Sequence, residues 1–203
     1  MRRGWIFLLA ILLAGDLGGV PPSGAQVMEG QRKATFAAGC FWGVEKIFSK
    51  VPGVISTQVG YTGGDLRDPG YYDVTTGKTG HAEAIEIIYD PAKVSYGELL
   101  TVFWQWHDPT TPNRQGPDIG SQYRSAIFFH DETQRALAEQ SKRLLEEAHV
   151  FDGPIVTEIA PAGPFYRAEE VHQQYLEKNP FGYCSHKIGS PRIRDVLSEI
   201  AVK

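Results

Sequence analysis

Cys40 is the residue whose surroundings best fit covalent chemistry. It lies in the run Gly39-Cys-Phe-Trp-Gly43, after a strand-like stretch and before apolar residues at helical spacing. A cysteine at the first turn of a helix faces free backbone N–H groups and the helix dipole, which favour the thiolate. The dipole stabilises the thiolate by roughly 0.3–1 kcal/mol. Lowering a pKa by one unit takes about 1.36 kcal/mol, so the dipole alone lowers the pKa of Cys40 by less than one unit. Another group, or the substrate itself, must therefore help to activate Cys40.

The second of the two cysteines, Cys184, lies in the turn-like stretch PFGYCS at 180–185. Two interpretations stay open. In an exported protein the pair could form a stabilising disulfide, worth about 4–5 kcal/mol from loop entropy. Alternatively, Cys40 is a nucleophile and Cys184 a thiol on a turn that can resolve its oxidised form. A structural cysteine has no need of flanking glycines and two adjacent aromatic residues, so the surroundings of Cys40 favour the second interpretation.

Short strand-like runs alternate with helical patterns and place Cys40 at a strand-to-helix junction. Strands are expected at 34–38, 54–61, 82–89, 124–129 and 155–160. Helices are expected from Phe41 to about Val51, from a Ser95 cap through Trp104, from an Asp131 cap to about Val150 with Gln134 completing a capping box, and over 168–178. The tail from Ser190 carries one apolar helical face: Ile193, Val196, Leu197 and Ile200.

This order of elements predicts an α+β fold in a single domain over residues 30–203. We expect a mixed β-sheet covered by helices, long functional loops and a coil-rich C-terminal segment. The loops at 62–80 and 107–122 hold most of the unusual polar residues, and loops of this length are uncommon unless they are functional.

The composition excludes several classes of protein. With 203 residues, 42% of them hydrophobic and 22% charged, the chain is suited to burying a core and not to wholesale disorder. A net charge of −4 without runs of like charge indicates no basic surface that would bind the phosphates of a nucleic acid. Two cysteines cannot make a four-cysteine zinc site, and the six histidines lack metal-ligand spacing. We expect no metal and no bound cofactor.

The first 25 residues have the pattern of a signal peptide. Arg2 and Arg3 precede the apolar run WIFLLAILLA at 5–14, and small residues at 23–25 offer a cleavage site. A retained membrane anchor is the alternative, although the run is about half of the ~20 residues that a spanning helix needs. We therefore expect an exported protein, periplasmic or secreted.

Several runs, in the same order, resemble the A-type peptide-methionine (S)-S-oxide reductases. They are GCFWG at 39–43, VGYTGG at 59–64, TGHAE at 79–83, HDPTTPNRQGPDIGSQYRSAIF at 107–128, FYRAEEVHQQYL at 165–176 and GYC at 182–184. The resemblance covers about residues 34–185. It implies reduction of methionine S-sulfoxide, protein-bound or free, in the repair of oxidative damage.

The resemblance also implies roles for individual residues. Cys40 would be the nucleophile, Glu83 the acid and Cys184 the resolving thiol. The other implied residues are the hydroxyl donors Tyr71 and Tyr123 and the substrate-binding residues Phe41, Trp42, Asp118 and Tyr183. Tyr72 adjoins Tyr71, but the spacing from Pro69 and Val74 favours Tyr71.

The chemistry of a sulfoxide requires these residue types. Attack by a thiolate on the sulfur needs hydrogen bonds and finally a proton for the sulfoxide oxygen. Glu83 stays protonated near neutral pH only in apolar surroundings. Cys40 would become a sulfenic acid, Cys184 would condense with it to a disulfide, and an external dithiol reductant such as a thioredoxin-like protein would reset the pair.

The tail departs from the family pattern. After GYC it is neither glycine-rich nor supplied with a further cysteine, which predicts a single resolving step. Export would separate the protein from cytoplasmic thioredoxin, so we expect an extracytoplasmic thioredoxin-like reductant. We expect a monomer without nucleic-acid partners and without stable membrane association after processing.

Two other classes of function remain open. A thiol hydrolase or acyl transferase would pair Cys40 with a histidine such as His107 or His172 and would not need Cys184. A non-catalytic binding module would use its aromatic residues as a ligand surface and hold a permanent Cys40–Cys184 disulfide. On a strand that alternates in polarity, Glu83 would ordinarily point outward into solvent.

Overall fold

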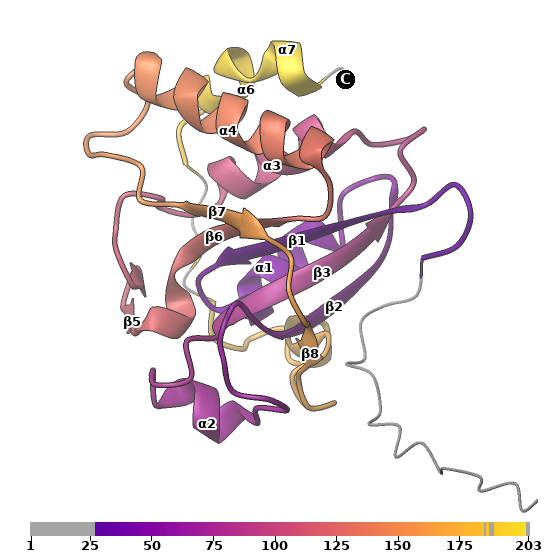
Figure 1. The fold of residues 1–203 in the computed structure, drawn as a ribbon, viewed down its shortest axis with the longest axis vertical. Coiled ribbons are helices and arrows are strands. Elements are labelled where there is room, and N and C mark those ends of the chain that lie inside the picture. The colour runs from indigo at the N-terminus through magenta and orange to yellow at the C-terminus, as the bar shows by residue number, and fades with distance from the viewer. Residues whose placement is uncertain (1–26, 185, 187–188, 202–203) are drawn as a thin grey trace, which may run out of the picture.

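A mixed sheet of six strands forms the centre of the structure (Figure 1), a computed structural model that describes residues 27–184, 186 and 189–201. The strand order is β7-β6-β1-β3-β2-β8, and neighbouring strands are antiparallel except for the parallel pair β6–β7. The strands are β1 (Arg32–Ala38), β2 (Val54–Thr62), β3 (Ala82–Tyr89), β6 (Ser125–Phe129), β7 (Glu158–Pro161) and β8 (Tyr166–Arg167). The α+β class with a mixed sheet is confirmed.

The two faces of the sheet bury different side chains. One face carries large residues such as Phe36 and Ile85, which pack against helical residues. The other face carries mainly alanines together with Phe128, and Phe165 packs against it. In β3 all eight residues are buried, so it is not the half-exposed strand that its alternating pattern suggests. Because side chains alternate along a strand, Glu83 lies on the same face as Ile85, toward the helices.

Three helices cover the first face: α1 (Phe41–Phe48), α3 (Tyr96–Gln105) and α4 (Glu132–Glu147). Figure 1 shows α3 and α4 stacked beside the sheet together with the C-terminal helices. The two expected caps are present, since Ser95 accepts the N–H of Glu98 and Asp131 that of Gln134. The Gln134 side chain accepts from the N–H of His130, one residue before the cap.

The helix expected over 168–178 is wrong for its first part, because only α5 (Tyr175–Lys178) is helical. The preceding residues follow the edge of β2. The side-chain amide of Gln173 bonds both the N–H and the carbonyl of Val59, at 3.0 and 2.9 Å. Gln174 then adopts a left-handed conformation with φ +52°. Pairing with a strand edge has replaced the internal bonds of a helix.

Smaller differences lie at other elements. The first helix ends at Phe48 and not near Val51, and the last expected strand lies at β7, shifted from 155–160. The loop 62–80 contains the short helix α2 (Tyr71–Thr75), and the loop 107–122 contains the hairpin β4 (Arg114–Gln115) and β5 (Asp118–Ile119).

The tail from Ser190 is helical along its apolar face, as expected, and this face packs onto the core. It forms α6 (Arg192–Val196) and α7 (Ser198–Ala201). Ile193, Leu197 and Ile200 are fully buried in the core that α3 and α4 share.

The expected signal peptide at 1–25 lies outside the described residues. Within the described part of the chain, no helix has the length and apolar character to cross a membrane.

Candidate active site

Cys40 lies at the junction of β1 and α1, as the sequence predicts. Gly39 turns the chain with φ +92°, a conformation open to glycine, and Cys40 caps the helix. Burial, with Cys40 only 6% exposed, raises its pKa far above the ordinary value, and the charge of Glu83 adds to this. The backbone N–H groups of Trp42 and Gly43 favour the thiolate but do not outweigh burial. The resting residue is a neutral thiol, so its activation must come with the substrate.

Glu83 projects from β3 beneath the start of α1. Its Oε2 accepts the backbone N–H of Phe41 at 3.0 Å. The side chain is 2% exposed, and burial raises its pKa to about 8 despite the bond from Phe41, which favours the charged form. At pH 7 most of Glu83 is therefore a carboxylic acid. The outward, solvated orientation does not occur, because both faces of β3 are covered.

Two phenols approach the site from the two long loops. Tyr71 begins α2, and Tyr123 ends the 3-10 turn η1 (Ser121–Tyr123). Burial raises the pKa of both phenols, and the charges of nearby Glu83 and Cys40 raise it further. Tyr72 is 85% exposed, and the fold thus brings Tyr71 and not its neighbour to the site.

Asp118 closes the polar side of the site from β5. Its charge raises the pKa of Cys40 and of Glu83, after burial as the main cause. The hydroxyl of Tyr183 donates to Asp118 Oδ1 at 2.9 Å. This bond ties the C-terminal segment that carries Cys184 to the loop 107–122.

An aromatic wall borders the other side of Cys40. The ring of Phe41 lies 5.4 Å from that of His172, and Trp42 stacks on Tyr175 with centroids 3.9 Å apart. The indole N–H of Trp42 donates to His172 Nδ1 at 3.2 Å, and the Tyr71 ring lies 4.5 Å from His172. This apolar wall suits the methyl group of a sulfoxide.

Cys184 lies over the first turn of α1. Both cysteines are free in the structure, Cys40 buried and Cys184 exposed. A Cβ placed on Gly43 would come 3.0 Å from Cys184 Sγ. Because Gly43 follows Cys40 by one helical turn, the two thiols border the same turn.

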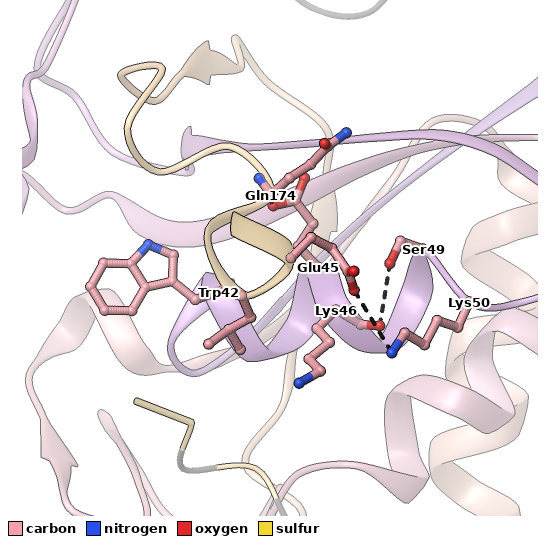
Figure 2. Close-up of a pocket in the computed structure, with 8 residues that line it drawn as sticks. Trp42, Glu45, Lys46, Ser49, Lys50 and Gln174 are labelled. Carbon is pink, nitrogen blue, oxygen red and sulfur yellow. Dashed lines mark hydrogen bonds and ion pairs between the residues drawn. The ribbon is translucent and has the colours of Figure 1, made fainter. Parts of the chain in front are cut away.

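Glu45 is a positioning residue that the sequence did not reveal. Figure 2 shows it on α1 between Trp42 and Lys50, beside a pocket of about 330 Å³. It is buried, and its Oε2 accepts the N–H of Gln174 at 2.6 Å. Glu45 therefore anchors the segment that presents His172 to Trp42. No pattern in the sequence distinguishes it from an exposed helical glutamate.

The two histidines considered as bases for Cys40 have other partners. His107 is bonded at Nδ1 to the Phe103 carbonyl and at Nε2 to Ser125 Oγ, each at 2.7 Å, and burial lowers its pKa to about 4. His172 uses Nδ1 to accept from Trp42. Among the residues described, no cluster of His, Cys, Asp and Glu is arranged to hold a metal ion.

Replacing His172 with alanine should loosen Trp42. The indole N–H would lose its acceptor in a partly buried position, which costs about 1–3 kcal/mol. We expect a lower melting temperature and a KM for a sulfoxide peptide raised about three- to tenfold, with a smaller change in kcat. Thermal denaturation and steady-state kinetics with dithiothreitol measure both, and His172→Gln, which keeps an acceptor, is the matched control. Unchanged kinetics in the alanine variant would contradict this role.

Comparisons with known proteins agree with this geometry. The family model described as peptide methionine sulfoxide reductase matches residues 32–200. A peptide methionine sulfoxide reductase MsrA of Methanothermobacter thermautotrophicus is 63% identical over 152 residues, covering 75% of this chain and 90% of the relative. The crystal structure of reduced Mxr1 from Saccharomyces cerevisiae superposes with a TM-score of 0.75 at 35% identity, covering 81% of this chain and 96% of that one. Methionine sulfoxide reductase A of Corynebacterium diphtheriae gives 0.69 at 41% identity, covering 77% and 79%. The chain belongs to the peptide methionine sulfoxide reductase family.

Proposed function

We propose that this chain reduces methionine S-sulfoxide, in proteins or as the free amino acid, with Cys40 as nucleophile and Glu83 as acid. The observation that carries these roles is the shared burial of a neutral thiol and a carboxylic acid at the start of α1. Glu83 Oε2 lies 3.0 Å from the backbone nitrogen of Phe41, the residue next to Cys40. Reduction of a sulfoxide needs one nucleophilic sulfur and one proton donor in the same dry pocket.

The substrate binds with its methyl group against Phe41 and Trp42 and its oxygen toward the polar side. Glu83, Tyr71 and Tyr123 donate hydrogen bonds to that oxygen, which makes the sulfur more electrophilic. Asp118 and Tyr183 hold the polar side together through their 2.9 Å bond.

Attack by Cys40 transfers the oxygen. A bond forms between Cys40 Sγ and the substrate sulfur while Glu83 gives its proton to the oxygen. The thiol proton of Cys40 restores Glu83. The sulfur–oxygen bond of the substrate and the new sulfur–sulfur bond then break, the oxygen passes to Cys40 Sγ as a sulfenic acid, and methionine leaves. The substrate sulfur is reduced and the cysteine sulfur is oxidised by the same two electrons.

Cys184 then condenses with the sulfenic acid to a disulfide, and a thioredoxin-like dithiol protein reduces it. A yeast relative, Mxr1, has been crystallised in complex with Trx2. In this chain Cys184 is the exposed cysteine and lies at the wall of a groove of about 890 Å³ between α1 and α3. An external thiol therefore reaches Cys184 Sγ first, with Cys40 as the leaving group.

The cellular setting of the proposal rests on the sequence. The apolar run at 5–14 after two arginines supports export through a signal peptide, and hence protein repair in the periplasm or outside the cell. The reductant would then be an extracytoplasmic thioredoxin-like protein. We expect a monomer, because the proposed chemistry uses nine residues of a single chain and needs no second subunit.

A single turnover tests the proposal. Reduced protein mixed with a methionine S-sulfoxide peptide, without added reductant, should release about one equivalent of methionine and acquire a Cys40–Cys184 disulfide. Chromatography measures the methionine, and intact mass with peptide mapping identifies the disulfide. The R epimer is the control substrate. Absence of methionine from folded, reduced protein would overturn the proposed function.

Cys184→Ser separates the two halves of the cycle. The variant should still release about one equivalent of methionine, because Cys184 takes no part in the attack. Its Cys40 should remain as a sulfenic acid after that turnover. With a thioredoxin-like protein as reductant, its turnover rate should fall more than about tenfold. Normal turnover with that reductant would show that Cys184 is not the resolving thiol.

A further inference from the structure

His186 lies against the first turn of α1, two residues after Cys184. Its Nε2 lies 2.7 Å from the carbonyl oxygen of Ala38. A carbonyl oxygen only accepts hydrogen bonds, so Nε2 carries the ring proton. The other nitrogen, Nδ1, therefore has a free lone pair in the neutral ring.

Nδ1 is buried, and no described residue offers it a hydrogen bond. Buried polar atoms without a partner are uncommon, and one beside a reactive site points to a transient partner. Positions 185, 187 and 188 lie outside the described residues.

The thiol of Cys184 lies beside Nδ1, over the same glycine. A Cβ placed on Gly43 would come 2.3 Å from His186 Nδ1 and 3.0 Å from Cys184 Sγ. His186 Nδ1 and Cys184 Sγ therefore lie on the same side of Gly43, and the distance between them cannot exceed the sum of these two distances. A Cβ on Gly39 would lie 3.6 Å from Nε2, so the imidazole lies between the two glycines that flank Cys40.

The charge state suits a proton acceptor. Burial lowers the pKa of His186, so the ring is neutral at pH 7, while the Ala38 carbonyl and Asp118 of β5 oppose the shift. His107, after α3, also faces it and is itself neutral with a pKa of about 4. Lys46 of α1 and Arg194 of α6 line the same groove.

We propose that His186 Nδ1 accepts the thiol proton of Cys184 when Cys184 attacks the Cys40 sulfenic acid; this rests on the proposed function. An ordinary thiol is only a few per cent ionised at neutral pH, so a resolving cysteine gains from a local base. The Cys184 proton passes to Nδ1, Cys184 Sγ bonds to Cys40 Sγ, and the sulfur–oxygen bond of the sulfenic acid breaks. The departing hydroxide takes the proton from the imidazolium and leaves as water. The sulfenic sulfur supplies the oxidising equivalent, so no other oxidant takes part.

His186→Gln tests this step. The glutamine amide can still donate to the Ala38 carbonyl but is not basic. In rapid-quench single turnovers with a methionine S-sulfoxide peptide, the rate of methionine release should stay at the wild-type value. The rate of disulfide formation should fall by at least about tenfold, and a dimedone trap should capture more Cys40 sulfenic acid. Added imidazole or a higher pH should restore the rate, which a merely structural defect would not allow.

The outcomes separate the inference from the proposed function. Disulfide formation at the wild-type rate in folded His186→Gln would overturn the role of His186. An equal fall in methionine release would also overturn it, because His186 would then act on the α1 turn as a whole. No methionine from the wild type would overturn the proposed function instead.

The wild type gives a second test that does not depend on a variant. Its rate of disulfide formation should level off above the pKa of His186, below that of an ordinary histidine, and should fall as Nδ1 is protonated at lower pH. A rate that rises steadily with pH from 5 to about 9, as for a free thiol, would contradict the inference.

Discussion

Cys40→Ser should release no measurable methionine in a single turnover, a loss of about 10⁴-fold or more. A serine hydroxyl is a far weaker nucleophile toward sulfur and cannot carry the oxygen as a sulfenic acid. The substitution is nearly isosteric at a buried helix cap, and serine is a good N-cap residue, so folding should be retained.

The measurement is chromatographic detection of methionine from reduced protein and a methionine S-sulfoxide peptide. Cys184→Ser, which removes the other thiol of the chain, is the matched control and should still release its one equivalent. Circular dichroism and thermal denaturation verify the fold of both variants. Methionine release by Cys40→Ser at a wild-type rate would place the nucleophile elsewhere.

Glu83→Gln should lower the rate of methionine release by about 10²–10⁴-fold, the usual contribution of a general acid. Glutamine preserves the size of the side chain and can accept the N–H of Phe41, but it has no proton to give. The substitution therefore removes the chemistry while leaving the pocket filled.

The pH dependence identifies Glu83 more sharply. Its pKa is raised to about 8, so the acid is present at pH 7 and is lost as the pH rises through about 8. Wild-type methionine release should fall over that interval, both because the proton is gone and because a carboxylate disfavours ionisation of Cys40. The glutamine variant should lack this descending limb. Glu86→Gln, on the same strand but paired with Lys33 at 2.8 Å, is the matched control and should keep it.

The central strands of the sheet can be predicted from the local sequence, whereas the segments at its edge cannot. The strand 82–89 is bounded by Gly80 and Asp90-Pro91, and its limits are those observed. The pattern of 168–178 is helical, yet the Gln173 amide bonds to Val59 of β2, a contact that no local pattern encodes. The short helix α2 lacks a long enough apolar repeat to be seen.

The site follows the same division. The place of Cys40 at a strand-to-helix turn comes from the chain around it. The burial of Glu83 requires covers on both faces of β3, which depend on the whole fold. Glu45 and His172 act through partners more than 100 positions away, so their spacing in the sequence carries no sign of it.

Burial of Cys40 has a consequence for the durability of the enzyme. Peroxide oxidises thiolates far more readily than thiols. Because Cys40 rests as a neutral thiol, the oxidants that damage methionine react only slowly with the Cys40 sulfur. In the proposed mechanism a sulfoxide supplies what peroxide lacks, which is a methyl group that fits the wall at Trp42 and an oxygen that takes the proton of Glu83. The low reactivity of the resting thiol therefore makes Cys40 selective for sulfoxides over peroxide and protects it from oxidation under oxidative stress.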